Sequence, residues 1–475
     1  MLNRLLGACA LSLCTVFGAA NAGTITNLAH QAPEGADITF QLTDGRVLAQ
    51  SFNEQHWYIL TPDNKGSYVN GSWTRAADLP AGYGPYAFAA SVLADGRVIV
   101  QGGEYNFGNF ELTGKGEIYN PQKDSWTKLK PPTRYIGDSS TVVLPDGRYV
   151  VAAKLQKKMY ALDPKTLTWS ELPTPGKRGF NSEEGLTLLP DGSLFIVNVK
   201  AAPQAQRYSF QDNSWHDVGP VPVKLNGPPC CTCVPYGPKQ KCYHPPGETG
   251  QSILRPDGSV FSTGATPSGE NHGHTAIYFP DTNKWKAGPD FPAGDDTGDN
   301  FAALLPSGNV LVQGNSGNAY EFDGTNLTNQ GVCTCGESLM VLPTGEVLLG
   351  GDAVYKGSGT YQAAWQPTIS DFPASVTRGS TYQISGTQFN GLSQANAFGD
   401  ELMTYTNYPL VRITNNSTGH VFYARTHDHS TMGVATGSTP VSTNFDVPSG
   451  METGASQLVV VANGIPSNPV SITVN

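Results

Sequence analysis

A short pattern that recurs along the chain constrains its fold more than any other feature: an apolar run, an Asp-Gly pair and a second apolar run. The best-formed copy runs from Leu93 to Gly103 around Asp95-Gly96. Asp-Gly between two alternating apolar runs favours the tight turn that closes a β-hairpin, so each copy predicts a hairpin. The turn glycines are Gly45, Gly96, Gly147, Gly192, Gly258, Gly308 and Gly345. Hairpins recurring roughly every fifty residues predict a repeat architecture.

A second turn followed by a large apolar residue accompanies the Asp-Gly turn in most repeats. Tryptophan occupies this place in five of them, and Leu327 takes it in the sixth: Trp73, Trp126, Trp169, Trp215 and Trp285. Two hairpins per repeat mean four strands, which is the pattern of a β-propeller blade with its Trp packed between blades. We therefore predict a seven-bladed β-propeller over residues 23–365.

The repeat ends at Trp365, and a different all-β pattern follows it. Short alternating strands without the Asp-Gly and Trp cycle continue to Asn475. About 110 residues of such strands predict an immunoglobulin-like β-sandwich over residues 366–475. The low share of charged residues (14%) and the 54 Gly and 35 Pro agree with an all-β chain rich in turns.

Residues 1–22 have the features of a cleaved signal peptide. Arg4 precedes a short apolar core, and Ala20-Asn21-Ala22 offers a small-residue cleavage site. This core is too short to span a bilayer, and no later stretch is long and apolar enough. We expect a secreted or periplasmic monomer with no transmembrane segment. The net charge of -10 argues against a nucleic-acid partner and favours neutral or cationic ligands.

The repeat also resembles a known family. The Asp-Gly-Arg-Val phrase and the double glycines Gly102-Gly103 and Gly350-Gly351 resemble kelch repeats. A kelch propeller followed by such a sandwich is similar to galactose oxidase and its relatives. This resemblance implies a copper ion held by two tyrosines and two histidines, with one tyrosine cross-linked to a cysteine in an early blade.

Most of those copper ligands are not matched. No cysteine after the signal peptide precedes Cys230, and Cys335-Gly336 stands where the family has Tyr-His. Two features match in part: Tyr86, with Tyr83 nearby, precedes the second turn, and Thr426-His427 resembles the Thr-His of the C-terminal loop that reaches the copper. The resemblance therefore implies the architecture of the family without its usual copper chemistry.

Counting back seven to nine residues from each Asp-Gly turn locates the mouth of the central channel. Polar residues, mostly carboxylates, recur at that level in consecutive blades: Asp138, Glu183, Glu184, Glu248, Asp299, Asn300 and Glu337. Neighbouring carboxylates raise one another's pKa values unless a cation neutralises them. Such a ring suits Ca²⁺ or a cationic or sugar ligand. The alternative is a solvated rim whose carboxylates cap loop amides.

Cysteine and histidine form further candidate groups. Six cysteines follow the signal peptide, and all are expected at the mouth of the channel: Cys230, Cys231, Cys233, Cys242, Cys333 and Cys335. In an exported protein they predict disulfides that order a loop over the channel, with the pairing open. The alternative is a thiolate site for Cu(I) or Zn²⁺, to which His244 and His272 or His274 add nitrogen ligands.

The second histidine group lies in the C-terminal domain. His427 and His429 share one face if they lie on a strand, and His-x-His is able to bind a metal. The alternative is a polar contact between the two domains.

These patterns favour one function and leave a second open. The first is an exported propeller that binds a carbohydrate or a cell-wall or cell-surface polymer at the channel face, without radical-copper chemistry. The alternative is a divergent copper oxidase of alcohols, aldehydes or sugars, or another metal-assisted enzyme. Calcium and copper are the candidate cofactors, and no catalytic residue is assigned.

Overall fold

The computed structural model describes residues 23–137, 139–229, 247–335, 338–396 and 404–475, and only the backbone of residues 232–236 and 239–243. Several predicted features lie outside the described residues: the signal peptide, Asp138, Cys230, Cys231, Glu337 and the side chains of Cys233 and Cys242. The described part consists of strands, turns and one 3-10 helix, η1 (Ala363–Trp365). None of its helices has the length and apolar character needed to cross a membrane.

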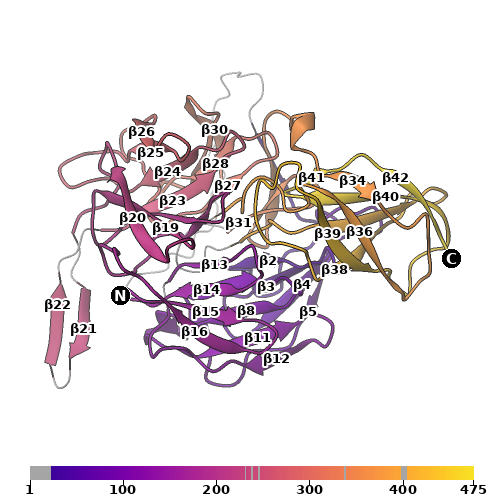
Figure 1. Ribbon diagram of the computed structural model, residues 1–475, viewed down its shortest axis with the longest axis horizontal. Coiled ribbons are helices and arrows are strands. Elements are labelled where there is room, and N and C mark those ends of the chain that lie inside the picture. The colour runs from indigo at the N-terminus through magenta and orange to yellow at the C-terminus, as the bar shows by residue number, and fades with distance from the viewer. Residues whose placement is uncertain are drawn as a thin grey trace.

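Seven four-stranded antiparallel sheets, numbered here as blades in chain order, make up the larger part of the described chain (Figure 1). Blade 1 consists of β2 (Thr39–Gln41), β3 (Val47–Gln50), β4 (Trp57–Thr61) and β5 (Ser72–Arg75), and blade 2 of β7 (Ala89–Val92), β8 (Val98–Gln101), β11 (Gly116–Asn120) and β12 (Ser125–Lys128). Blade 3 consists of β13 (Thr141–Val143), β14 (Tyr149–Ala152), β15 (Met159–Asp163) and β16 (Thr168–Leu172), and blade 4 of β17 (Thr187–Leu188), β18 (Leu194–Val197), β19 (Gln204–Ser209) and β20 (Ser214–Pro220). Blade 5 consists of β23 (Thr249–Leu254), β24 (Val260–Gly264), β25 (Thr275–Phe279) and β26 (Lys284–Ala287), blade 6 of β27 (Ala302–Leu304), β28 (Val310–Gln313), β29 (Asn318–Phe322) and β30 (Leu327–Cys333), and blade 7 of β31 (Leu339–Val341), β32 (Val347–Leu349), β33 (Ala353–Lys356) and β1 (Thr24–Asn27).

The blades form a closed ring. The N-terminal strand β1 completes blade 7, where Thr24 pairs with Lys356. Innermost strands of neighbouring blades touch one another: β2 contacts β7 and β31, β7 contacts β13, β23 contacts β17 and β27, and β27 contacts β31. The added strand covers the outer edge of β33 and holds the two ends of the ring together.

The two sequence landmarks take the positions that they predicted. Each Asp-Gly pair joins the first and second strands of a blade, and Gly45 and Gly96 have φ of 81° and 84°. The Trp of the fourth strand reaches back to the preceding blade, since the ring nitrogen of Trp126 donates to Ala77 O and that of Trp285 donates to Val218 O, both at 2.8 Å. The repeat is therefore a scaffold. We call the face with the Asp-Gly turns the turn face, and the opposite one the mouth face.

Two smaller sheets lie outside the blades. A three-stranded sheet on the mouth face of blade 2 consists of β6 (Pro85–Tyr86), β9 (Tyr105–Asn106) and β10 (Asn109–Phe110). The hairpin of β21 (Thr232–Tyr236) and β22 (Lys239–Tyr243) projects from the propeller between blades 4 and 5 (Figure 1, lower left). In this hairpin Cys233 is the backbone partner of Cys242.

The C-terminal residues form a curled sheet with its own core. Its strands are β34 (Thr368–Asp371), β35 (Ser375–Val376), β36 (Thr381–Thr387), β37 (Leu410–Asn415), β38 (Val421–His427), β39 (Val441–Asp446), β40 (Gly454–Ala462), β41 (Ile465–Pro466) and β42 (Val470–Val474). Hydrogen bonds join them into one path, and Val376, Ile413 and Phe445 lie in the enclosed core. An all-β C-terminal part was expected. Its immunoglobulin-like character and the boundary at residue 365 stay predictions.

The C-terminal part inserts a segment into the turn-face end of the channel. Leu304 N donates to Ala395 O at 2.9 Å, and Leu188 N donates to Gln394 Oε1 at 2.7 Å. The hydroxyls of Tyr405 and Tyr408 donate to the main-chain oxygens of Thr141 and Gln41. These bonds reach the innermost strands of blades 1, 3, 4 and 6. The described residues of this segment thus enter the channel from the turn face.

Candidate functional site at the channel mouth

Three of the carboxylates predicted at the channel mouth come together. Glu183, Glu248 and Asp299 precede the innermost strands of blades 4, 5 and 6. The carboxyl group of Glu248 lies within interaction distance of both of the others. They meet because each stands eight or nine residues before the turn that ends its own inner strand.

A lysine neutralises one member of this group. Lys154, from the turn that follows β14 of blade 3, donates to Glu183 Oε1 at 2.5 Å, and both side chains are more than nine-tenths buried. Burial alone would raise the pKa of Glu183, but the ammonium groups of Lys154 and Lys200 outweigh it and hold that pKa below its usual value. Glu183 is therefore the ionised member of the group.

Glu248 carries the opposite shift. Burial, followed by the negative charges of Glu183 and Asp299, raises the pKa of Glu248 to about 10. The Glu183 Oε2 atom is buried and accepts no hydrogen bond from an amide, hydroxyl or ammonium donor. A proton on Glu248 supplies the missing donor, because two facing carboxylate oxygens otherwise repel each other. The group thus holds a protonated and an ionised carboxyl side by side.

The neighbouring polar residues of the predicted ring have structural roles. Glu184 accepts from Lys177 Nζ at 3.0 Å and from Ser182 N at 3.0 Å, in a buried position. The amide of Asn300 donates to Thr297 O at 2.5 Å within its own loop. These two residues follow the alternative prediction, a rim whose polar groups cap loops. Asp138 and Glu337 lie outside the described residues.

Aromatic side chains also lie on the mouth face, in the three-stranded sheet over blade 2. Tyr86 pairs with Tyr105 across β6 and β9, with ring centroids 6.2 Å apart, and Phe110 packs edge-on against Tyr105 at 6.0 Å. The Phe110 side chain is 55% exposed. The described residues include further exposed rings in loops of this face: Phe52, Phe107 and Phe180.

Glu104 links the aromatic sheet to the carboxylates. Its backbone N–H donates to Tyr86 O at 3.1 Å. Burial, together with the negative charge of Glu183, raises the pKa of Glu104, and the ammonium group of Lys154 opposes this shift. Sequence reasoning identified Tyr86 but missed Glu104, Lys154 and the phenylalanines. The exposed phenylalanines sit in loops between polar neighbours, and an isolated apolar residue in a loop is the signal that could have found them.

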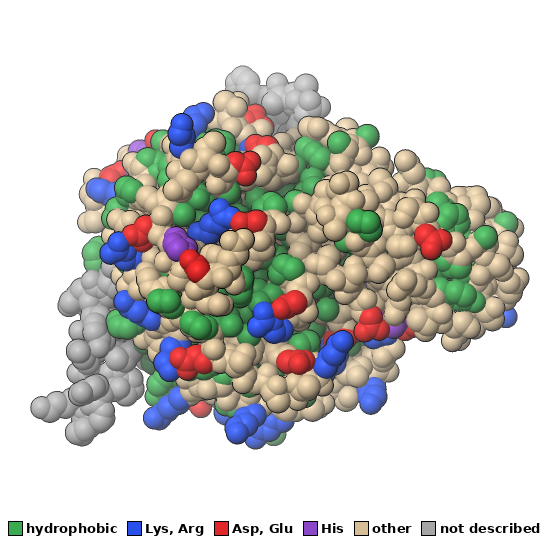
Figure 2. All heavy atoms as spheres, in the orientation of Figure 1, with side chains coloured by type: hydrophobic (Ala, Val, Ile, Leu, Met, Phe, Trp, Pro, Cys, Tyr) green, Lys and Arg blue, Asp and Glu red, His purple; other side chains and the backbone are tan. Residues whose placement is uncertain are grey.

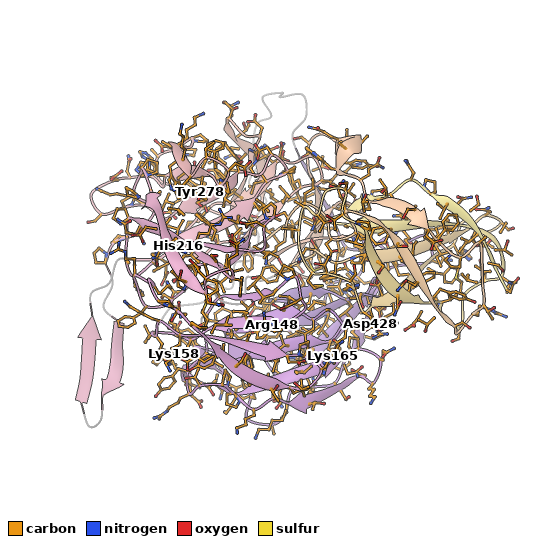
Figure 3. The ribbon with its side chains drawn as sticks, in the orientation of Figure 1. Arg148, Lys158, Lys165, His216, Tyr278 and Asp428 are labelled. Carbon is orange, nitrogen blue, oxygen red and sulfur yellow. A yellow bond between two sulfur atoms is a disulfide. The ribbon has the colours of Figure 1, made fainter. Side chains whose placement is uncertain are left out.

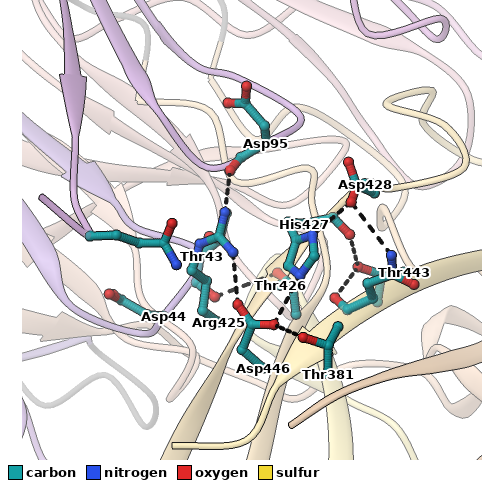
Figure 4. Close-up of polar contacts among 12 residues, drawn as sticks. Thr43, Asp44, Asp95, Thr381, Arg425, Thr426, His427, Asp428, Thr443 and Asp446 are labelled. Atoms are coloured by element: carbon teal, nitrogen blue, oxygen red, sulfur yellow. Dashed lines mark hydrogen bonds and ion pairs between the residues drawn. The ribbon is translucent and has the colours of Figure 1, made fainter. Parts of the chain in front are cut away.

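His427 lies at the turn face, because the backbone N–H of the preceding Thr426 donates to Thr43 O beside the first Asp-Gly turn (Figure 4). His429 follows two residues later, whereas the carboxylates precede inner strands at the mouth face. His427 contacts two carboxylates, Asp428 at 2.8 Å and Asp446 at 3.1 Å. Arg425 bridges from Asp446 to the main-chain oxygen of Asp95, an Asp-Gly turn residue. This network joins the C-terminal sheet to the propeller, as the alternative prediction had it.

The geometry of the His-x-His pair also differs from the expected strand. β38 ends at His427, and Asp428 has φ of 51°, so that His429 leaves the strand. His429 is buried against Thr443 at 2.9 Å, and burial lowers its pKa to about 3. Among the described residues, this pair belongs to no group of three side chains able to hold a metal.

The cysteines that the structure describes in full form a disulfide within one loop. Cys333 and Cys335 are joined across two residues at the end of β30. This pairing tightens the loop before blade 7 and does not connect it to the cysteine-rich hairpin. Disulfides were expected for this stretch, and the local pairing of Cys333 with Cys335 is one of the connectivities that the sequence left open.

A cavity of about 580 Å³ lies away from the channel, between blades 4 and 5. Its lining includes Asp191, Arg207, His216 and Tyr278, and Figure 3 shows the last two on the outer side of the propeller. The face drawn in Figure 2 shows acidic and basic side chains mixed over the propeller, without a continuous basic patch.

The donor set at the described channel mouth does not fit the radical-copper centre that the resemblance implied. The groups there are carboxylates and a lysine, whereas that centre needs two histidines and two tyrosines. Tyr83 is buried and donates to Gly102 O at 2.8 Å, and the histidines discussed above lie on other faces or other loops. The described part of the mouth therefore does not supply the ligands of such a centre.

The fold defined by these blades is that of a kelch or galactose-oxidase-like propeller. A fungal alcohol oxidase of the AA5 family, solved in complex with copper, matches with a TM-score of 0.52 and 14% identity over 96% of this chain and 100% of that one. A second solved structure, YjhT, matches with a TM-score of 0.44 and 16% identity over 64% of this chain and 99% of that one.

Sequence comparison adds a distant relative. A kelch-like protein, terF of Aspergillus terreus (strain NIH 2624 / FGSC A1156), is 33% identical over 90 residues. The match covers 18% of this chain and 19% of that relative, so the chain spans about a fifth of the relative's length in this match. No family model matches the chain. The likenesses to the fungal alcohol oxidase and to the kelch-like protein support the fold, and the activity has to be argued from the site.

Proposed function

We propose that the protein binds a carbohydrate, such as a cell-wall or cell-surface polymer, at the mouth face of the channel after export, and without radical-copper chemistry. One observation carries the proposal: exposed aromatic rings and a buried network of polar groups lie on the same face of the propeller. Sugars present an apolar ring face and a rim of hydroxyls, so rings that stack and carboxyls that hydrogen-bond match both parts.

The charges of the network favour a neutral ligand over Ca²⁺. Lys154 compensates Glu183, and Glu248 is neutral at physiological pH. A calcium ion prefers several ionised carboxylates with free lone pairs, and it would have to displace the Glu248 proton. The hydroxyl groups of a neutral sugar, in contrast, donate to a carboxylate without displacing the Glu248 proton.

A glycan array with the chain from residue 23 onward tests this proposal. Phe110→Ala removes an exposed ring without opening the core, and Phe279→Ala is a matched control because its ring, 37% exposed, lies in blade 5 at the turn-face end of β25. We expect enrichment of a defined glycan class, lost by roughly tenfold in Phe110→Ala and kept in Phe279→Ala. Binding no stronger than that of the denatured protein, or equal effects of both substitutions, would refute the proposal.

A second candidate function is hydrolysis of the same ligand. The observation that favours it is the opposite protonation of two adjacent carboxyls, since glycoside hydrolysis needs a carboxylic acid and a carboxylate. Glu248 would donate its proton to the glycosidic oxygen as the C–O bond breaks, and Glu183 would take a proton from the water that forms the new C–O bond at the anomeric carbon. This step requires the two carboxyls, which are in contact without the ligand, to separate around the substrate. Release of reducing ends from the bound glycan, abolished in Glu248→Gln, supports hydrolysis, whereas binding without any release shows that the protein only binds.

A further inference from the structure

A second cluster of side chains lies on the mouth face of blade 5, outside the carboxylate network. His272 and His274 are in the loop between β24 and β25, and Asp290 follows β26. The two imidazole rings are 4.9 Å apart and nearly perpendicular. One ligand atom from each of the three residues lies within 4.8 Å of the others.

The second nitrogen of each ring is held in place by a neighbour. Asn271 Oδ1 lies 2.9 Å from Nδ1 of His272, and Glu270 Oε2 lies 2.5 Å from Nε2 of His274. Both oxygens are acceptors, so each of these ring nitrogens donates its proton outward. The remaining nitrogens, Nε2 of His272 and Nδ1 of His274, face the Asp290 carboxylate at 3.5 and 2.7 Å. Outer acceptors that orient metal-binding histidines in this way are typical of protein metal sites.

The backbone fixes the two loops against each other. Gly273 N donates to Asp295 O at 2.9 Å, and Phe291 N donates to Gly273 O at 3.0 Å. A Cβ at Gly273 would lie 2.6 Å from the Asp296 Cβ, so glycine is required between the histidines for this close approach. The histidines and Asp290 are therefore held on facing loops, and Lys224 binds Glu270 from outside at 3.3 Å.

We propose that His272 Nε2, His274 Nδ1 and Asp290 form a binding site for a divalent transition metal of the Zn²⁺ class. Tetrahedral ligands about 2.0–2.1 Å from zinc lie about 3.3 Å apart, which is close to the observed separations. In the metal-free protein a proton on His274 Nδ1 takes the place of the ion. Two imidazoles and one carboxylate leave a coordination position open. Asp290 is half exposed, so a water molecule or an oxygen ligand from solution is able to enter there. This site does not depend on the proposed function.

Metal binding to chelator-treated, thiol-alkylated protein tests the site, since alkylation removes the cysteines as competing ligands. We expect about one equivalent of Zn²⁺ after gel filtration, a raised melting temperature, and with Co²⁺ a d–d spectrum without a thiolate charge-transfer band. His274→Gln and Asp290→Asn should lose binding at least tenfold. His216→Gln is the matched control, because His216 pairs with Asp212 at 2.8 Å through one ring nitrogen and belongs to no such group in the described chain.

Two results would overturn the proposal. One is that the wild type retains less than about a tenth of an equivalent of Zn²⁺. The other is that His274→Gln and Asp290→Asn bind the ion as well as His216→Gln does. Circular dichroism of each variant confirms that it is folded, and using two substitutions on different loops keeps a folding failure in one from deciding the outcome.

Discussion

Replacing Glu248 by Gln tests the protonation state of the channel-mouth carboxylates. In the native protein the pKa of Glu248 is raised from 4.5 to about 10, so between these values the folded chain holds a proton that the unfolded chain releases. Stability therefore falls as the pH rises through this window, by about 1.4 kcal/mol per pH unit for one proton. Between the ordinary pKa of a glutamate and neutral pH, the total loss of unfolding free energy is at most about 3 kcal/mol. Gln is neutral at every pH and avoids this loss.

Urea unfolding followed by Trp fluorescence at about pH 5, 6, 7 and 8 measures this difference. We expect Glu248→Gln to become more stable than the wild type, by an amount that widens with pH. The control is Glu171→Gln, which removes an exposed carboxylate 2.9 Å from Lys158 and should leave the pH dependence unchanged. A constant offset between Glu248→Gln and the wild type over this range would refute the proton on Glu248.

Three further predictions concern groups that hold the site in place. Lys177→Met leaves the buried carboxylate of Glu184 unpaired and should lower the free energy of unfolding by about 3–5 kcal/mol in urea, whereas Lys158→Met at an exposed pair should change it little. Tyr408→Phe removes the hydroxyl that donates to Gln41 O; we expect a loss of about 1 kcal/mol and faster amide exchange at the turn-face end of the channel. Burial lowers the pKa of His429 to about 3, so below about pH 6.5 the unfolded chain binds a proton that the native chain does not. Stability should fall on acidification, and His429→Gln should flatten that acid limb in thermal unfolding.

The blades could be predicted from the sequence because their signals are local. The turn at Asp95-Gly96 depends on the conformation of two adjacent residues, and the corresponding turn of each blade has the same requirement. The Trp positions were equally reliable, since Trp126 contacts the connection after the preceding blade and every repeat supplies that neighbour. A repeat therefore also locates the ends of its inner strands, which is how Glu183, Glu248 and Asp299 were found.

What could not be predicted depends on contacts between distant residues. Glu183 and Glu184 are adjacent, yet the first joins the channel network and the second binds Lys177, and no local pattern separates them. Lys154 comes from another blade. The alternation of side chains along a strand predicted His427 and His429 on one face, but the strand ends between them, where Asp428 has a positive φ. The alternation rule holds only where the backbone stays extended.

The central claim is that the mouth face of the channel is the binding surface. Hydrogen–deuterium exchange of the protein with and without a saturating glycan from the array tests it most directly. We predict protection in residues 102–113, 180–188 and 247–254, which carry the exposed rings and the carboxylates, and none around residues 425–446 at the turn face. Protection confined to the turn face, or to the cavity beside His216 and Tyr278, would contradict the account.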